Sequence, residues 1–526
     1  MHRTNPQLTA PDTSLVDSLM SPAAFKHPVS SIELVETHIS WLFLTDEYVY
    51  KLKKPLVLDF LDFGDLERRK FYCEEEIRLN KPWAPDIYLD VVPVSLENSQ
   101  AVFGGSVTPV DYAVRMRRFD QEMRLDAQLE HDKLLAADMQ ELARNIAQRH
   151  AGAEIAAQVH RDRYISLTVE FIWDNFAALE GFIDAAQLDS LRKWTAAELK
   201  KTGSALRRRF DDGFVRDCHG DLHLANLVRL PDGITTFDCI EFNVDLRRID
   251  VACDVAFLIM DLVSRQRHDL AAHFLNRYLE CTGDYAGVTL LNLYFVYRCL
   301  VRAKVAVILS QQHETDIARA ADLNEAHRYC DMAQRQIARR NPLLVVMTGF
   351  SGSGKTWVSE QLMAAMPAVR VRSDIERKRM SGLKETQDSA SAVGKGLYTE
   401  KTSHDVYARL FKHAATILES GHNVILDAAF LSTADRAKAL HAAKNCGCQA
   451  TILEVRAPND ILHKRIQARS RRADDASEAG LEVLEYQIET AEPLTDQEKK
   501  LSVICDNDGE IDIVAIAKQL KELAIS

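Results

Sequence analysis

The sequence predicts an α+β domain of two lobes, followed by an α/β domain with a doubly wound parallel sheet. Residues 30–120 read as strands with one helix, and residues 121–335 read as mostly helical. From residue 343 to residue 526, apolar strands alternate with helical segments. Strands that precede a run of helices are typical of α+β domains, and regular alternation is typical of a parallel sheet that is covered on both faces.

Two short segments complete this division of the chain. Residues 1–29 are expected to be an N-terminal extension, and residues 336–342 are expected to be a linker. The linker follows from the stretch 333–342, in which a helical pattern ends with basic residues and Pro342.

The composition excludes several classes of protein. Hydrophobic residues make up 47% of the 526 residues and charged residues 27%, which argues against extensive disorder. Apolar runs such as Val255–Met260 are far shorter than the roughly 18 residues of a membrane span. Residues 1–24 lack the pattern of a secretory signal. The ten cysteines include no C-x-x-C pair, so we expect reduced thiols, no zinc site, and a cytoplasmic protein without membrane contact.

The net charge of the chain is negative. Lys and Arg number 65 and Asp and Glu number 77, so the formal charge is 65 − 77 = −12. Contacts to nucleic-acid phosphates require clustered Lys and Arg. The charge balance therefore counts against a general nucleic-acid binder, although local basic clusters exist.

The first domain begins with a predicted hairpin. The apolar runs Trp41–Leu44 and Tyr48–Leu52 are separated by three polar residues. Leu66–Asn80 predicts a helix, and Ile87–Val94 and Asp111–Met116 predict further strands.

Helical patterns follow, interrupted by one strand-and-loop region. We expect helices over 123–130, 133–150 and 185–210, and again over 254–340. Residues 214–254 lie between them and are rich in Asp, His and Asn, which favours a loop region that carries a site.

The second domain is predicted from its strands. Leu343–Thr348 is continuously apolar, as expected for a parallel strand that is buried on both faces. The other expected strands are Val369–Arg372, Asn423–Leu426, Ala450–Val455 and Ser502–Cys505.

A phosphate-binding loop follows the first of these strands. Residues 349–356 read GFSGSGKT and match G-x-x-x-x-G-K-[ST] at every fixed position. The backbone N–H groups of such a loop form a nest for phosphates, and the helix predicted over Trp357–Ala365 adds its positive N-terminus. The expected ATP-binding residues are Gly349, Ser351, Gly352, Ser353, Gly354, Lys355 and Thr356, with Lys355 at the β/γ-phosphates and Thr356 as a Mg²⁺ ligand.

Three further residues fit the same site. Asp427 ends an apolar strand and is placed to orient Mg²⁺. Asp374 follows the second strand and is a candidate base for an acceptor hydroxyl, with Arg377 one helical turn later. Helix or strand capping by the two aspartates, with a solvated Arg377, is the alternative.

A basic cluster lies where a lid over the nucleotide is expected. It consists of Lys464, Arg465, Arg469, Arg471 and Arg472. Arginines at this place stabilise charge on a transferred phosphoryl group. We name Arg465 and Arg469 as nucleotide contacts, and a solvated helix face is the alternative.

The segments GFSGSGKT, SDIERKRM and VILDAAFL resemble P-loop kinases. The resemblance is to the gluconate-kinase-like, zeta-toxin-like and polynucleotide-kinase-like branch, and it covers roughly residues 342–526. In that branch the D-x-x-R spacing of Asp374 and Arg377 implies an acceptor base and a phosphate-contacting arginine.

A second set of polar residues lies in the first domain. In HGDLHLANL (219–227), Asp221 and Asn226 are five residues apart, a spacing that suits one metal–phosphate site. Asp221 would orient the acceptor hydroxyl, and Asn226 would bind Mg²⁺. The strand-like residues 234–237 lead to Asp238, a second metal ligand. We interpret His219 as structural, and Asp250 and Asp254 as braces of the loop.

This set resembles the aminoglycoside phosphotransferase and choline-kinase branch of the protein-kinase-like fold. Tyr48-Val-Tyr-Lys51 resembles the strand lysine that binds the α/β-phosphates, with Lys53 on the same strand face and Lys54 as another competitor. Its partner is expected among Glu74–Glu76, and we favour Glu75. The order of both modules resembles bacterial fusions of an aminoglycoside-phosphotransferase-like domain with a P-loop ATPase.

The sequence therefore predicts two ATP- and Mg²⁺-dependent phosphotransferase modules that act on small-molecule hydroxyl acceptors. Two alternatives stay open. One is a nucleotide-driven regulator with a ligand-sensing first half and an ATP-hydrolysing second half. The other is a nucleic-acid end-processing 5′-kinase, and a toxin-like sugar-nucleotide kinase is a variant of the main interpretation.

Overall fold

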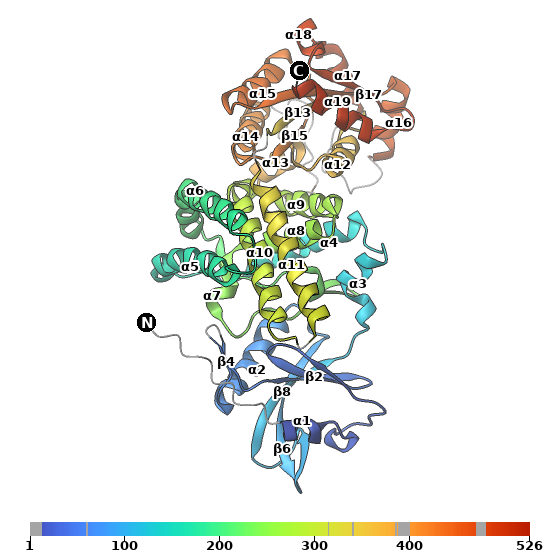
Figure 1. The fold of residues 1–526 in the computed structure, drawn as a ribbon. Helices are drawn as coiled ribbons and strands as arrows, with labels where there is room; N and C mark the ends of the chain where they lie inside the picture. Colours follow the sequence, from blue (N-terminus) through green and yellow to red (C-terminus); the bar gives the residue numbers. More distant parts are fainter. Residues whose placement is uncertain are drawn as a thin grey trace. The chain divides into compact units, whose positions relative to one another are not determined.

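The chain folds into two compact units, which we describe separately (Figure 1). The computed structural model describes residues 13–58, 61–313, 315–338, 341–383, 387, 400–469 and 480–525. The first unit comprises the chain up to Leu134 together with Gly152–Leu167 and Arg209–Leu258. The second comprises Leu135–Ala151, Thr168–Arg208 and the chain from Ile259 onward. The expected domain boundaries stay predictions.

A six-stranded antiparallel sheet forms the core of the first unit. Its strand order is β1-β2-β3-β8-β6-β7. The strands are β1 (Glu33–Glu36), β2 (Ser40–Leu44), β3 (Tyr48–Lys53), β6 (Tyr88–Glu97), β7 (Gln100–Phe103) and β8 (Pro109–Arg117), beside a small pair, β4 (Val57–Leu58) and β5 (Leu61–Asp62). The predicted hairpin is confirmed, because β2 and β3 pair in antiparallel register.

Two helices pack on this sheet. The helix α2 has the predicted bounds, Leu66–Asn80, and begins after Asp65, whose carboxylate accepts the Arg68 N–H. The short helix α1 (Thr13–Leu19) contributes Val16 and Leu19 to the same apolar cluster as Phe43 and Phe103. The fold of the first unit therefore begins within the segment that we expected to be an extension.

Short elements surround the loop that carries the polar residues of the first unit. The strands β9 (Val215–Asp217) and β12 (Arg248–Asp250) pair, and β10 (Leu227–Leu230) and β11 (Gly233–Thr236) form a hairpin. Between them lie a short 3₁₀ turn at Leu224–Asn226 and the helix α7 (Val244–Arg247). The strand-and-loop region that we expected over 214–254 is confirmed.

Most of the remaining chain before residue 343 is helical. The helices are α3 (Leu125–Glu130), α4 (Ala136–Gly152), α5 (Arg161–Leu179), α6 (Ala185–Asp211), α8 (Val251–Ser264), α9 (His268–Thr282), α10 (Val288–Ser310) and α11 (Asp316–Ile337). Among the residues placed, no helix combines the length and apolarity that crossing a membrane demands. The helix α5 lies within the stretch 121–210, which was expected to be mostly helical, but it is not one of the three segments predicted there.

A five-stranded parallel sheet dominates the rest of the second unit. Its order is β14-β15-β13-β16-β17. The strands are β13 (Leu343–Thr348), β14 (Ala368–Arg372), β15 (Asn423–Asp427), β16 (Gln449–Arg456) and β17 (Ser502–Asp506). All six residues of β13 are buried, as predicted for a central strand.

Helices cover both faces of this sheet. Residues of α12 (Lys355–Ala365) and α19 (Ile513–Ile525) form one apolar cluster with alternate strand residues, and α14 (Glu400–Glu419) and α15 (Thr433–Asn445) pack on the sheet as well (Figure 1). The other helices are α13 (Ser373–Met380), α16 (Asn459–Arg469), α17 (Leu481–Thr490) and α18 (Asp496–Lys499). The predicted fold class, an α+β part followed by a doubly wound α/β domain, is confirmed.

Candidate active sites

The strand lysine of the first unit lies between two carboxylates. The Lys51 Nζ atom is 2.8 Å from Glu76 Oε1 and 2.5 Å from Asp238 Oδ1. Burial alone would lower the pKa of Lys51, but the carboxylates of Asp238 and Glu76 outweigh burial and hold the pKa well above its ordinary value. Lys51 therefore carries a fixed positive charge at the place where the sequence predicted phosphate binding.

The predicted partner of this lysine was wrong by one residue. Glu75 forms an ion pair with Arg78, at 2.7 Å, and lies 3.8 Å from Arg247. Glu76 faces β3 instead and is fully buried. A helix turns about 100° per residue, so neighbouring glutamates point in different directions and only one of them can face the sheet. Motif spacing alone could not decide between them.

A second lysine shares the same glutamate. Lys53 Nζ is 2.7 Å from Glu76 Oε2 and also pairs with Glu241. The two lysines lie on one face of β3, as strand alternation predicted. Lys54 was the third candidate for the phosphate-binding lysine. It does not contact Glu76, because its Nζ donates to Glu36 and to the Thr37 carbonyl instead. Sequence reasoning missed Glu241, although its position three residues after Asp238 is visible in the sequence.

The loop after β9 brings the predicted base and metal ligand together. The Asn226 side-chain amide donates to Asp221 Oδ2 at 2.9 Å and to the Asp221 carbonyl at 3.0 Å. His223 Nε2 lies 3.2 Å from the same carboxylate oxygen. Asp221 and Asn226 thus meet as predicted, and His223 is an additional neighbour.

Asp238 enters the site from the end of the β10–β11 hairpin. Phe237 N–H donates to the Asn226 carbonyl, which ties the residue before Asp238 to residues 219–226, the candidate catalytic loop. Asp238 has a positive φ of 60°, a conformation that is costly for an Asp and is often found at functional sites. Its backbone N–H donates to the Tyr88 hydroxyl at 3.0 Å.

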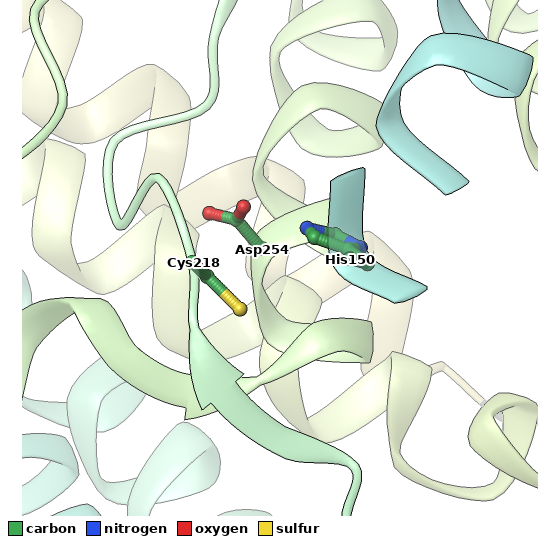
Figure 2. Close-up of side chains that lie close together, drawn as sticks. All are labelled: His150, Cys218 and Asp254. Carbon is green, nitrogen blue, oxygen red and sulfur yellow. The ribbon is translucent and has the colours of Figure 1, made fainter. Parts of the chain in front are cut away.

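Buried groups behind the loop hold it in place. The Asp254 carboxylate accepts the backbone N–H groups of His219, at 3.2 Å, and Gly220, at 2.9 Å (Figure 2). His219 Nε2 lies 2.9 Å from the Phe237 carbonyl, and burial lowers its pKa. Cys218 precedes them, and burial raises the pKa of its thiol (Figure 2). The structural interpretation of His219 and of Asp254 agrees with these contacts.

Asp250 braces the same region through a second buried contact. Its two carboxylate oxygens accept bonds from the Arg209 guanidinium at 2.7 and 2.8 Å. Both side chains are buried, so this bidentate pair joins the end of α6 to the start of α8.

In the second unit, the glycine loop is built for close backbone approach. Gly349, Gly352 and Gly354 all have positive φ values. A Cβ atom at Gly349 would lie 2.3 Å from the Val455 carbonyl oxygen. Only glycine therefore fits where β13 ends and the loop begins.

The predicted magnesium and phosphate residues converge at the end of β13 and β15. Lys355 Nζ donates to the carbonyls of Gly349 and Phe350, both at 2.9 Å, so it curls over the loop. Asp427 Oδ2 accepts the Ser359 hydroxyl at 2.9 Å. Ser359 lies one turn after Thr356 on α12 and was missed by sequence reasoning, although its i+3 spacing was visible.

Asp374 and Arg377 both lie on α13, which starts directly after β14. Arg377 is buried and its Nη1 donates to Ser403 at 3.3 Å. The helix therefore presents Asp374 in its first turn and turns Arg377 towards α14. Their roles as base and phosphate contact stay predictions.

The predicted lid residues divide into two groups. Arg465 Nη1 donates to the carbonyls of Gly352 and Ser353, and its Nη2 donates to the Asn507 carbonyl, so Arg465 contacts the phosphate loop. Arg469 ends α16, but its side chain lies outside the described part of the chain, as do Arg471 and Arg472 entirely. Gln487 of α17 is a further loop contact, since its Oε1 accepts the Ser351 N–H at 2.8 Å.

The donor sets of both sites fit Mg²⁺ and ATP. Asn226 and Asp238 in the first unit, and Thr356 and Asp427 in the second, offer hard oxygen ligands, which Mg²⁺ prefers. Lys51 and Lys355 supply the positive charges that ATP phosphates require. In the first unit, a lysine–glutamate pair, an Asp–Asn pair in one loop and a strand-borne aspartate lie together. Protein kinases position phosphates and metal ions with the same kinds of residue.

Comparisons with known proteins find similarity over part of the second unit and over most of the chain. The family described as AAA domain matches residues 344–494, which include the glycine loop, Asp374 and Asp427. An uncharacterized protein of Mycobacterium tuberculosis is 29% identical over 459 residues, which are 86% of this chain and 89% of the relative. A Mycobacterium bovis protein matches equally.

Several solved structures of kinases are similar to parts of the chain. A gluconokinase from Sinorhizobium meliloti has 21% identity over 36% of this chain and 96% of its own, with a TM-score of 0.26. A choline/ethanolamine kinase family protein from Mesorhizobium loti has 13% identity over 62% of this chain and 97% of its own, with a TM-score of 0.38. A Plasmodium vivax ethanolamine kinase has 12% identity over 58% and 84%, with a TM-score of 0.38.

Proposed function

We propose that this chain is an ATP-dependent phosphotransferase in which each unit moves the γ-phosphoryl group of ATP to a hydroxyl acceptor. The observation that carries the proposal is the convergence of Lys51, Glu76 and Asp238 in the unit that also joins Asp221 to Asn226. The second unit supports it with a glycine loop, Lys355 and Asp427 at adjacent strand ends.

In the first unit, the residues divide the work of in-line transfer. Lys51 binds the α/β-phosphates and is held in position by Glu76. Asn226 and Asp238 would hold Mg²⁺, which would supply charge neutralisation at the phosphates. Asp221 accepts the proton of the acceptor hydroxyl, and the donated hydrogen bond from Asn226 keeps its carboxylate oriented.

In the second unit, most residues of the site position the phosphates or stabilise their charge. The backbone N–H groups of Gly349–Thr356 cradle the phosphates, and Lys355 swings from the loop carbonyls to the β/γ-phosphates. Thr356 and Asp427 would hold Mg²⁺. Asp374 takes the acceptor proton, and Arg377 and Arg465 stabilise the developing charge. A small-molecule acceptor in a cytoplasmic setting is part of the proposal.

The proposal is tested by phosphoryl transfer from radiolabelled ATP in the full chain. The purified protein is incubated with Mg²⁺-ATP and a mixture of small alcohols, amino alcohols and sugars, and both phosphate release and new phosphorylated species are followed. Asp221→Asn should lower the transfer by the first unit about 10²- to 10⁴-fold. Lys355→Ala should lower the transfer by the second unit about 10²- to 10³-fold.

Matched variants separate these losses from general damage. Asp232→Asn changes an exposed aspartate of the β10–β11 turn, and Lys438→Ala changes an exposed lysine of α15. Both should leave transfer unchanged. Phosphate release without any phosphorylated acceptor would favour the nucleotide-driven regulator instead. A product found only with oligonucleotide 5′ ends would favour the end-processing kinase, whose binding should fall steeply with added salt.

A further inference from the structure

A buried glutamate from the helical part of the second unit reaches the phosphate-loop site. Glu280 lies in the last turn of α9, and only 4% of the residue is exposed. It belongs to none of the sequence motifs named above for the phosphate-loop site. It also lies outside residues 344–494, which match the AAA domain family. The helix α9 and the parallel sheet are parts of the same compact unit.

Glu280 is surrounded by arginines of strand β14. Its Oε1 is 2.7 Å from Arg370 Nη2, and its Oε2 is 3.9 Å from Arg372 Nη1. Arg277 of the same helix approaches Oε2 at 3.4 Å. Burial would raise the pKa of Glu280, but the arginines outweigh burial and lower it, so the carboxylate stays charged.

The two β14 arginines connect this carboxylate with the predicted magnesium residues. Arg370 Nη1 lies 3.3 Å from the Thr356 carbonyl and 3.3 Å from Ser359 Oγ. Arg372 Nε lies 3.9 Å from Asp427 Oδ2, the oxygen that accepts the Ser359 hydroxyl. The contacts form a closed ring through Glu280, Arg370, Ser359, Asp427 and Arg372.

A second residue of α9 fixes the strand that carries these arginines. Among the strands of the described residues, β14 lies at the edge of the parallel sheet, so one side of its backbone has no neighbour among them. Asn276 Nδ2 donates to the Ala368 carbonyl at 2.9 Å, and the Arg370 N–H donates to Asn276 Oδ1 at 2.6 Å. The side-chain amide thus takes the place of a further strand, and the register between α9 and β14 is fixed.

We propose that Glu280 is a positioning residue of the phosphate-loop site. By holding Arg370 and Arg372, it fixes the Thr356 backbone and the Asp427 carboxylate, and so sets the geometry in which the site binds a Mg²⁺-nucleotide. The helical part of the second unit is therefore a working component of the nucleotide site. This inference rests on the proposed function only in that the site must bind Mg²⁺-nucleotide.

The test is equilibrium binding of ADP to the full chain, once with Mg²⁺ and once with EDTA. The binding event that Lys355→Ala removes from the wild-type protein defines the phosphate-loop site. Glu280→Gln keeps the shape of the side chain and removes its charge. Residues that orient metal ligands typically contribute about 10- to 100-fold to metal affinity. We expect a weakening of at least about tenfold with Mg²⁺, and a much smaller change with EDTA.

Two further variants control for folding. Asp269→Asn removes a half-exposed carboxylate in the first turn of α9, which pairs with Arg267 directly before the helix, and it should change neither measurement. Glu280→Gln leaves Arg370 buried without its carboxylate, which lowers stability. Combining it with Arg370→Gln removes both charges, so thermal stability should recover while binding with Mg²⁺ stays weak.

Each outcome decides a different point. If the wild-type chain shows no ADP binding that depends on Lys355, the proposed function of the second unit is wrong. If it binds, but Glu280→Gln binds with wild-type affinity in Mg²⁺, the positioning role is overturned. If the single variant does not fold, the double variant decides, because recovery of both stability and Mg²⁺-ADP affinity would show a structural role alone.

Discussion

At the scale of single residues, the first site is organised by a glutamate between two lysines. Glu76 accepts Lys51 on one carboxylate oxygen and Lys53 on the other, and all three side chains are buried. Removal of one partner from such a group leaves a buried charge without its counterion, which costs about 3–5 kcal/mol. Lys51, for which we propose phosphate binding, is thereby held in position by Glu76.

Neighbouring glutamates provide the sharpest test of this arrangement. Glu76→Gln should destabilise the first unit by about 3 kcal/mol or more and weaken its nucleotide binding, because Lys51 and Lys53 lose their shared carboxylate. Glu75→Gln removes the partly exposed pair with Arg78 and a longer contact of 3.8 Å with Arg247, so we expect a change below about 1 kcal/mol. Thermal unfolding and nucleotide titration measure both effects. Equal losses of stability and of nucleotide binding in the two variants would show that Glu76 is not the residue that holds Lys51 in position.

Two glycines, Gly349 of the second unit and Gly152 of the first, offer a similar comparison. A Cβ at Gly349 would collide with a backbone carbonyl, whereas a Cβ at Gly152, at the end of α4, would meet nothing within 4 Å. Gly349→Ala should therefore abolish nucleotide binding at the phosphate loop and lower the melting temperature. Gly152→Ala should be neutral or slightly stabilising, because alanine restricts the unfolded chain more than glycine. Nucleotide binding that survives in Gly349→Ala would contradict the account of the loop.

At the scale of elements, helices hold the loops that carry chemistry. Asp254, in the first turn of α8, accepts two consecutive backbone N–H groups of the catalytic loop. Hydrogen bonds from backbone N–H to a charged carboxylate are among the strong ones. The helix therefore fixes the approach to Asp221.

Asp254→Asn should loosen this loop without removing a reacting group. The neutral amide accepts such bonds more weakly, so we expect faster amide hydrogen exchange at residues 219–226 and a roughly tenfold lower transfer rate. Nucleotide affinity should change little, because Lys51 and Glu76 lie on other elements. Unchanged exchange in the catalytic loop would contradict the bracing role of Asp254.

The elements also show how far the sequence could predict the structure. The helix Leu66–Asn80 and the strand Leu343–Thr348 have the predicted bounds, since apolar periodicity and clear breaks define both. The convergence of Asp221 with Asn226 followed from their short separation. Glu280 could not be found in this way, because its role depends on a helix that meets an edge strand some ninety residues later in the chain, and no local pattern encodes such a contact.

At the scale of the whole molecule, buried ion pairs make the free energy of unfolding of the chain depend on pH. Burial would raise the pKa of Glu76, but Lys51 and Lys53 outweigh burial and lower it to about 2, from an ordinary value of 4.5. Unfolded chains therefore take up this proton at a higher pH than folded ones. The stabilisation by Glu76 is complete above about pH 4.5 and is lost as the pH falls towards 2.

This dependence predicts how the wild-type chain and Glu76→Gln compare in acid. The difference in their unfolding free energies should be largest at neutral pH and should shrink as the pH falls from 4.5 towards 2. Calorimetric unfolding at several pH values measures it. A difference that stays constant over this range would show that the Glu76 carboxylate is not held in its charged form by the lysines.

The central claim is that one chain contains two separate Mg²⁺-nucleotide sites, and the stoichiometry of binding tests it most directly. Equilibrium dialysis of the full chain with ADP and Mg²⁺ should give two nucleotides per chain. Asp238→Asn and Lys355→Ala should each leave one, and the double variant should leave none. A single nucleotide per chain, or two that persist in the double variant, would contradict the account.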